Sequence, residues 1–422
     1  MNLKKYKLGE LVEVTRGMSL SGQYYSETGT LIRLTLGNFN MNGGGFKENT
    51  SKTDIYFTGP VKEEYILQEG DIITPLTEQS LGLLGTTARI PESGKYIQSQ
   101  DVALIKCKEG LIDRNFCFYL ISSNIVRQQL SAAAQQTKIR HTSPDKIKDC
   151  TVWIPNFEDQ KRIGRILTDI DSKIAINRQI NDNLEVMAKQ LYDYWFVQFD
   201  FPNEEGKPYK SSGGKMVWND KLKREIPAGW SSKMISEIEG NIVTGKTPSC
   251  ANEDNFGGDI PFVTIDDIRG NLFVFQAQRT LSKLGADSQY KKYLPEGSLC
   301  VSCIGTIGVM GFVARLAQTN QQINSIIFGK EYNKEFSYFS LMLHFDNAKA
   351  KTGNVFANMN KEEFASIYIA YPSIELLQKY HEIVLPMFDT IKTNTSEILN
   401  LIKQRDDLLP LLMNGQVSVN SD

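Results

Sequence analysis

The chain contains no long hydrophobic segment. Within its 422 residues, about 18 consecutive uncharged apolar residues, the length that would span a membrane, occur nowhere. Residues 1–8 include several lysines, but the apolar stretch of a secretory signal peptide does not follow them. We therefore expect a cytoplasmic protein. With 41% hydrophobic and 23% charged residues, the composition is that of an ordinary globular chain, long enough for two or three domains.

Cysteine and histidine are both scarce. The six cysteines are expected to be reduced thiols, because nothing in the sequence indicates secretion. Cys300 and Cys303 have the spacing of a zinc knuckle, but no second pair of cysteines or histidines completes four ligands. We interpret them as two buried thiols on a strand. The three histidines are too scattered for a metal or acid-base site.

The sequence also lacks an excess of positive charge. Its 47 Lys and Arg residues are balanced by 49 Asp and Glu residues, which gives a formal net charge of −2. No global positive field would therefore hold the protein on a polyanion. Any binding of DNA has to be local, or shared with a partner.

Recognisable catalytic motifs are missing as well. We find no Asp/Asn-Pro-Pro-aromatic segment of an amino-methylating DNA enzyme, no strand leading into G-x-G-x-x-G, no nuclease carboxylate cluster and no Ser/His/Asp set. Residues 240–247 fit the phosphate-loop pattern, but Pro248 and turn-forming residues follow where a helix is needed. We predict a basic loop there, no bound metal or cofactor, and no catalysis by this chain alone.

What the sequence does contain is an internal repeat. Residues 8–11 resemble residues 235–238, and residues 67–71 resemble residues 294–298, both at an offset of 227. A third match, at an offset of 226, pairs residues 82–89 with residues 308–315. The matches predict one fold that occurs twice.

Each copy ends in a long helical period. About 40 residues of helix would span roughly 60 Å, more than the diameter of the domain before it, so we predict that the two helices pair as an antiparallel coiled coil. Asn177 would be a polar residue that sets their register. The predicted coiled-coil spacer residues are Ile163, Ile166, Ile170, Asn177, Ile180, Leu184, Met187 and Leu191 in the first helix, and Phe388, Ile391, Ile398, Ile402, Leu409 and Leu412 in the second.

The rest of each copy predicts an α+β domain. Short β-branched and aromatic runs bounded by glycines indicate a mainly antiparallel sheet with peripheral helices. The expected division is a first domain at 1–156, a first spacer helix at 157–198, a connector at 199–225, a second domain at 226–373, a second spacer helix at 374–415 and a tail at 416–422.

Two similar domains held apart by helices have the geometry of a reader of two separated half-sites on DNA. Because the copies differ in sequence, they can read different half-sites. Geometry alone leaves open a two-domain scaffold that binds proteins and no DNA, and the phosphate-loop pattern leaves a nucleotide hydrolase as a third alternative.

Four segments in order resemble the specificity subunit of Type I restriction-modification systems. They are LEVMAKQLYDYWFVQFD (184–200), IPAGW (226–230), GKTPS (245–249) and LLPLLMNG (408–415). The resemblance implies two target-recognition domains that each read half of a bipartite, asymmetric DNA sequence, with the paired helices as the spacer. It also implies a complex with two methyltransferase (M) subunits, which bind S-adenosylmethionine and methylate adenine, and with restriction (R) subunits, which use ATP and Mg²⁺. The chain would then determine which DNA sequence the complex acts on and would itself catalyse no reaction.

Polar residues in loops of the two domains are the candidates for DNA contact. Arg and Lys suit guanine or phosphate, Asn and Gln suit adenine, and Asp can accept from cytosine N4. The candidates are Arg16, Ser19, Arg33, Asn38, Thr77, Gln79, Ser80, Lys138, Arg140 and His141 in the first copy, and Lys246, Thr247, Asp266, Ser302, Thr306, Asn354 and Asn358 in the second. Since residues 15–18 replace the Gly-Lys-Thr-Pro form of the second copy, the sequence does not establish that the two loops are equivalent.

Overall fold

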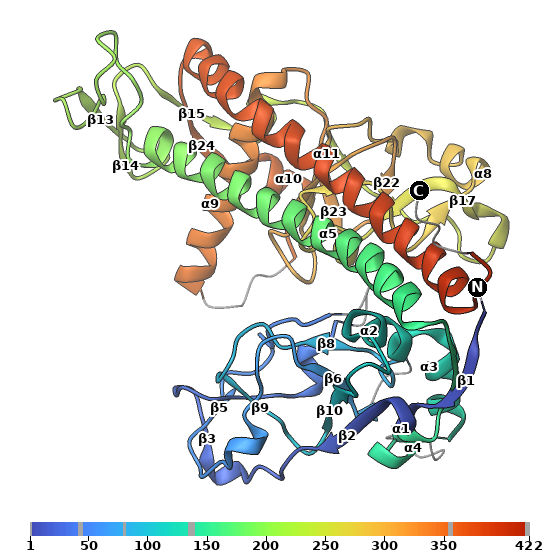
Figure 1. Ribbon diagram of the computed structural model, residues 1–422. Coiled ribbons are helices and arrows are strands. Elements are labelled where there is room, and N and C mark those ends of the chain that lie inside the picture. Colours follow the sequence, from blue (N-terminus) through green and yellow to red (C-terminus); the bar gives the residue numbers. More distant parts are fainter. Residues whose placement is uncertain (1, 41–44, 79–81, 134–139, 353–357, 418–422) are drawn as a thin grey trace. The chain divides into compact units, whose positions relative to one another are not determined.

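The computed structural model describes residues 2–40, 45–78, 82–133, 140–352 and 358–417 (Figure 1). The chain forms two compact units. Unit 1 comprises residues 1–175 with 399–422, and unit 2 comprises residues 176–398. Each unit combines sheet and helix, so the predicted α+β class is confirmed.

Unit 1 is built on a four-stranded antiparallel sheet with the order β2-β10-β6-β8. Its strands are β2 (Val12–Arg16), β6 (Ile72–Pro75), β8 (Ala88–Arg89) and β10 (Val102–Cys107). A second sheet has the order β3 (Tyr25–Ser26), β5 (Tyr56–Phe57), β4 (Ile32–Arg33) and β9 (Tyr96–Ile97). Two further strand pairs are β1 (Lys4–Lys7) with β12 (Thr151–Ile154) and β7 (Thr77–Glu78) with β11 (Arg140–His141). The short helices are α1 (Leu8–Leu11), α2 (Arg114–Ser122), α3 (Asn124–Ala133) and α4 (Pro144–Lys148).

Unit 2 is built on a five-stranded sheet with the order β16-β23-β20-β21-β18. Its strands are β16 (Ile242–Thr244), β18 (Phe273–Val274), β20 (Leu299–Ser302), β21 (Met310–Val313) and β23 (Ile323–Ile326). Around it are β19 (Thr280–Leu281), β17 (Phe256–Val263) and β22 (Gln318–Thr319), the hairpin of β13 (Met216–Asn219) and β14 (Arg224–Pro227), and β15 (Ser231–Met234) paired with β24 (Tyr368–Tyr371). The helices are α6 (Ile235–Ile238), α7 (Ile265–Ile268), α8 (Lys283–Asp287), α9 (Lys334–Thr352) and α10 (Lys361–Ala365).

The two central sheets repeat one topology. The order β2-β10-β6-β8 in unit 1 returns as β16-β23-β20-β21 in unit 2. The offset of 227 relates β1 to β15, α1 to α6 and β6 to β20. The predicted internal repeat is therefore confirmed by the connectivity of the fold as well as by similar residues.

One of the three sequence matches is wrong in register. Arg89 lies opposite Ile72 on β6, whereas Phe312 lies opposite Leu299 on β20. Because Ile72 and Leu299 are equivalent, Arg89 corresponds to Phe312 and not to Arg315. The connection from β6 to β8 is longer than the one from β20 to β21, so a constant offset fails beyond it.

The two long helices run antiparallel to one another (Figure 1). They are α5 (Phe157–Tyr192), with 36 residues, and α11 (Ile374–Met413), with 40 residues, which at 1.5 Å per residue span about 54 and 60 Å. As residue numbers rise along α5, those of the bonded partners fall along α11. The bonded pairs are Asp171 with Arg405, Asn177 with Glu397, Asn181 with Asn394 and Ala188 with Tyr380. This order confirms the predicted antiparallel coiled coil.

Most of the predicted spacer residues face the interior, but two do not. Ile163, Asn177, Phe388, Ile391, Ile398 and Leu412 are buried, and Ile166, Ile170, Leu184, Leu191, Ile402 and Leu409 are half-buried. Ile180 and Met187 are 40% and 51% exposed. On a straight α-helix, positions seven residues apart drift by about 20° around the helix axis with each repeat, so a strict heptad pattern gradually leaves the contact face. The polar Asn181 and the small Ala188 take the seam positions beside them.

Both long helices contribute to the hydrophobic cores. In unit 1, Ile163 and Leu167 of α5 lie in one cluster with Leu412 of α11. In unit 2, the C-terminal part of α5 and the N-terminal part of α11, represented by Tyr192 and Tyr380, share an aromatic cluster. Each helix is therefore part of the core in each unit, and not an appended rod.

Candidate nucleic-acid interface

In unit 1, three strand ends meet at one edge of the central sheet. Ala103 on β10 pairs with Arg16 on β2 and with Thr74 on β6, so the ends of β2 and β6 lie beside the start of β10. The segments that extend beyond this row are residues 17–20 and residues 98–101. We call these two segments, together with Arg16 and the β7–β11 pair, edge 1.

Unit 2 has the same construction. Asn324 on β23 pairs with Thr244 on β16 and with Val301 on β20. The segments that extend beyond this row are residues 245–248, 303–306 and 319–322, which we call edge 2.

Backbone hydrogen bonds show that the loops after β2 and β16 are equivalent. The Gly17 amide donates to the Val102 carbonyl and the Met18 amide donates to the Gln98 carbonyl. The second copy repeats both bonds, since the Gly245 amide donates to Ile323 and the Lys246 amide donates to Thr319. Lys246 therefore corresponds to Met18, and Thr247 corresponds to Ser19, an equivalence that the sequence did not establish.

The two glycines explain why this loop persists although its other residues differ. A Cβ on Gly17 would lie 2.3 Å from the Gln98 carbonyl oxygen, and a Cβ on Gly245 would lie 2.1 Å from the Asn320 carbonyl oxygen. Any side chain at these positions would displace the neighbouring loop. Glycine thus keeps each loop packed directly against the segment that leads into the next strand.

Several of the candidate DNA contacts lie together on these edges. In edge 1, Arg16, Ser19 and His141 are exposed. Arg140 is half-buried, donates to Ser131 over 3.1 Å and lies 3.7 Å from the buried carboxylate of Glu78.

The candidates of the second copy lie in edge 2 or in segments that are bonded to it. Lys246 and Thr306 are exposed, and Thr247 is half-buried. Asn358 is exposed, and the next residue binds the Cys303 carbonyl through its amide. Asp266 is exposed beyond β17, whose last residue pairs with Thr319 of edge 2.

Two candidates of the first copy are buried and bonded within their own unit. Arg33 is 6% exposed, lies 3.8 Å above the ring of Tyr25 and donates to the Asp54 carboxylate over 3.1 Å. Asn38 is 2% exposed and accepts from the Thr35 amide over 2.9 Å. Both side chains are engaged with groups of their own fold in this structure.

Thr77 and Ser302 are also buried. Thr77 lies within β7, opposite His141. Ser302 accepts from the Val309 amide over 2.9 Å and is fully buried. The sequence did not predict that these four polar side chains are buried, because a loop pattern does not reveal which polar side chains satisfy buried groups. Their contact with DNA stays a prediction. Gln79, Ser80, Lys138 and Asn354 lie outside the described residues.

The structure adds two residues that the sequence analysis missed, Gln100 in edge 1 and Gln321 in edge 2. Both are exposed. The hydroxyl of Thr247 donates to Oε1 of Gln321 over 2.7 Å. In the sequence, each of these glutamines lies in a polar segment just before an apolar strand. These two segments are 221 residues apart, whereas the surrounding matches are 227 residues apart, so the repeat does not align the two glutamines.

The phosphate-loop pattern at residues 240–247 does not form a phosphate loop. The amides of Gly245 and Lys246 are already bonded to carbonyls. The segment that follows is irregular and leads into β17 through a short 3-10 turn, whereas phosphate binding needs the N-terminus of a helix. The two C-x-x-C thiols, Cys300 and Cys303, are 0% and 1% exposed, as predicted for buried thiols, and burial raises their pKa values to about 12 and about 11.

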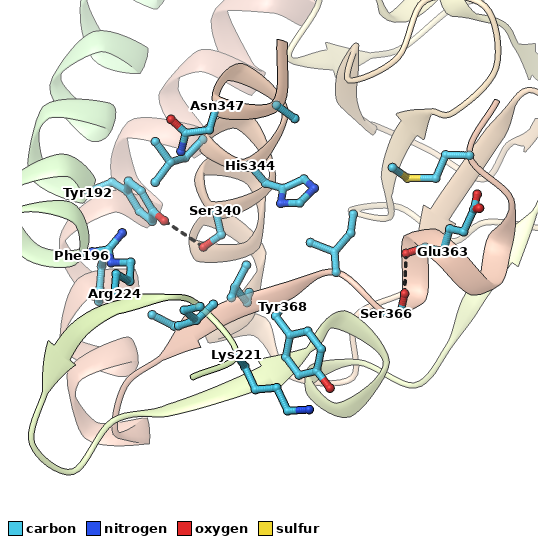
Figure 2. Close-up of a pocket in the computed structure, with 17 residues that line it drawn as sticks. Tyr192, Phe196, Lys221, Arg224, Ser340, His344, Asn347, Glu363, Ser366 and Tyr368 are labelled. Atoms are coloured by element: carbon cyan, nitrogen blue, oxygen red, sulfur yellow. Dashed lines mark hydrogen bonds between the residues drawn. The ribbon is translucent and has the colours of Figure 1, made fainter. Parts of the chain in front are cut away.

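Unit 2 also contains a cavity of about 590 Å³ between α9, α10, β24 and the β13–β14 hairpin (Figure 2). Tyr192 and Ser340 form a hydroxyl pair at 3.0 Å on one wall. Beside Tyr192, the Arg224 guanidinium is partly buried, and this burial lowers its pKa. The Glu363 carboxylate accepts from the Asn360 amide and so caps α10. Among the candidate DNA contacts that the structure describes, none lines this cavity.

Comparison with known proteins agrees with the duplicated architecture. Residues 2–186 and 227–404 match the family model described as the Type I restriction modification DNA specificity domain. The Type I restriction enzyme HindI specificity subunit of Haemophilus influenzae is 31% identical over 374 residues, which cover 76% of this chain and 81% of that protein. The MjaIX specificity subunit of Methanocaldococcus jannaschii is 24% identical over 322 residues, which cover 74% of this chain and 71% of that protein.

The fold is also found in a solved structure. The Type I restriction-modification system S subunit from M. genitalium superposes with a TM-score of 0.60 at 15% identity, over 98% of this chain and 96% of that one. The two matched segments contain the two sheet edges described above. The chain belongs to the family of Type I restriction-modification DNA specificity subunits.

Proposed function

We propose that this chain reads a bipartite, asymmetric DNA target and that each unit reads one half of it. The observation that carries the proposal is that one sheet edge occurs twice, with equivalent strand registers and backbone hydrogen bonds but different side chains. Met18 and Ser19 occupy the places that Lys246 and Thr247 occupy in the second copy. Equivalent backbone would present each edge to DNA in the same way, and the different side chains would select different bases.

The exposed residues of the edges supply suitable chemistry. Arg16 and Lys246 can contact phosphate or guanine, and His141, Thr306 and Asn358 can bind base edges or phosphate oxygens. The candidates outside the described residues, Gln79, Ser80, Lys138 and Asn354, belong to the same proposal.

Partners complete the proposed enzyme. Two M subunits, which bind S-adenosylmethionine, would methylate adenine, and R subunits with ATP and Mg²⁺ would cut DNA, whereas this chain would be non-catalytic. The net charge of −2 supports DNA binding that is shared with these subunits, because a protein that bound DNA alone through many phosphates would benefit from a basic surface.

The test compares the isolated chain with its complex with M subunits. We expect weak DNA affinity for the chain alone and at least a tenfold gain, about 1.4 kcal/mol, in the complex at the same salt concentration. Sequencing the methylated adenines should yield one bipartite motif. Equal affinity in both states, or methylation without a defined sequence, would contradict the proposal and favour a scaffold.

A further inference from the structure

The two edges share one exposed side chain that the sequence analysis did not single out. We propose, on the basis of the proposed function, that Gln100 and Gln321 are equivalent base-reading residues, one for each half-site. Each would recognise adenine through its side-chain amide. Three observations carry this inference: the register of the strands, the exposure of the loop residues and the bond between Thr247 and Gln321.

Two independent registers make Gln100 and Gln321 equivalent. Val102 pairs with Pro75 at the end of β6, and Ile323 pairs with Ser302 at the end of β20. Because β6 and β20 are related by 227 residues, Val102 corresponds to Ile323, which is an offset of 221. The backbone bonds from the loops after β2 and β16 reach Val102 and Ile323 as well, and give the same offset.

Only one residue in each of these four-residue segments is exposed. In residues 98–101, Gln98 is buried and donates to two carbonyls, whereas Gln100 is exposed. In residues 319–322, Thr319 is buried, Asn320 and Gln322 bond to each other, and Gln321 is exposed. The same position therefore points to solvent in both copies, and both times it is glutamine.

The chemistry of the amide suits adenine. Adenine presents the N7 acceptor and the N6 donor, and a carboxamide can bind both with its nitrogen and its oxygen. The Thr247 hydroxyl donates to Oε1 of Gln321 over 2.7 Å and leaves the second lone pair and both Nε2 hydrogens available. Thr247 is thus a positioning residue. Ser19 holds a hydroxyl at the equivalent position in edge 1.

The first experiment uses the full chain assembled with its M subunits and reads the methylated motif by sequencing. Gln321→Ala should reduce the preference for adenine at one position of one half-site by about 5- to 150-fold. Gln100→Ala should do the same in the other half-site only. Each variant is therefore the internal control for the other. Gln321→Glu, which keeps the size but cannot donate to N7, should lose the same adenine.

A second series tests the positioning role of Thr247. Thr247→Val removes the hydroxyl and should weaken the same discrimination, whereas Thr247→Ser keeps it and should retain the preference of the wild type. Gln276→Ala is the matched control. Gln276 is exposed beyond β18, whose Val274 pairs with Val313 at the end of the sheet opposite edge 2. This variant should leave the motif unchanged.

The outcomes separate this inference from the proposed function. A wild-type bipartite motif that stays unchanged in Gln100→Ala and Gln321→Ala would overturn the inference and leave the proposed function standing. Changes by both variants in the same half-site would also overturn it. If the wild-type complex methylates no bipartite sequence, the proposed function fails, and the inference fails with it.

Discussion

At the scale of single residues, a hydrogen bond between a half-buried histidine and a buried glutamate joins two helices of unit 2. Nδ1 of His381 on α11 lies 2.7 Å from the carboxylate of Glu335 on α9, and their side chains are 15% and 4% exposed. The hydrogen bond to Glu335 raises the pKa of His381 above its usual 6.5, although burial acts in the opposite direction. Glu331 adds to the increase and Lys334 opposes it.

This pair predicts a pH-dependent stability. Because the pKa of His381 is higher in the folded protein, its contribution is complete below the unfolded pKa and is lost as pH rises through the folded one. His381→Gln should destabilise unit 2 by about 1–2 kcal/mol near pH 5.5 and by less above pH 8. Thermal unfolding of both proteins across this range measures the difference, with the exposed His141→Gln as control. A difference independent of pH would contradict the assignment.

At the scale of elements, α5 has two apolar faces. One is the seam with α11. The other carries Ile176, Ile180 and Met187, which are 56%, 40% and 51% exposed and lie within about 40° of one another around the helix. A contiguous exposed apolar patch on a protein surface often marks a contact with a partner. On the proposed function, we expect an M subunit to cover this stripe.

Introducing charge into this stripe should therefore weaken assembly without unfolding unit 2. Ile180→Asp combined with Met187→Asp is expected to lower the affinity for the M subunit at least tenfold, because two carboxylates would be desolvated at the interface. Gln179→Asp, exposed on the same helix but away from the stripe, is the control. Titration followed by sedimentation measures the affinity. Unchanged assembly of the double variant would place the M subunit elsewhere.

At the scale of the whole molecule, the two long helices supply core residues to both units. Ile163 of α5 and Leu412 of α11 belong to the core of unit 1, and Tyr192 and Tyr380 belong to that of unit 2. Their length is therefore part of the fold and cannot vary independently of it. On the proposed function, we propose that the length of these helices determines how far apart the two half-sites lie.

Removing one heptad from each helix tests this proposal. Deleting residues 174–180 and 394–400, centred on the bonded pair Asn177 and Glu397, shortens both helices by about 10 Å, roughly 3 base pairs. The methylated motif should keep both half-sites and lose about three positions from its spacer. Deletion from α5 alone breaks the register and should abolish assembly. If the spacer stays unchanged in the double deletion, the helices do not determine the distance between the half-sites.

Much of the architecture followed from local patterns. The repeat at 227 residues predicted two copies of one fold, and the heptad spacing predicted two paired helices, with Asn177 buried in their seam and bonded to Glu397. The helix faces were predicted less well. Ile180 and Met187 fit the heptad pattern, but Asn181 and Ala188 occupy the seam because the pairing also depends on the residues of α11.

The candidate DNA contacts also show which features the sequence predicts and which depend on the tertiary structure. Composition and order along the chain by themselves determined the duplication, the helical spacers and the absence of recognisable catalytic motifs, because these depend on periodicity and on residue types close in sequence. Only the tertiary structure decided that Arg33 and Asn38 are buried and that Gln100 and Gln321 occupy equivalent exposed positions. The reason is physical: whether a polar side chain stays available depends on which distant backbone groups it must satisfy, and the packing of the sheets determines that.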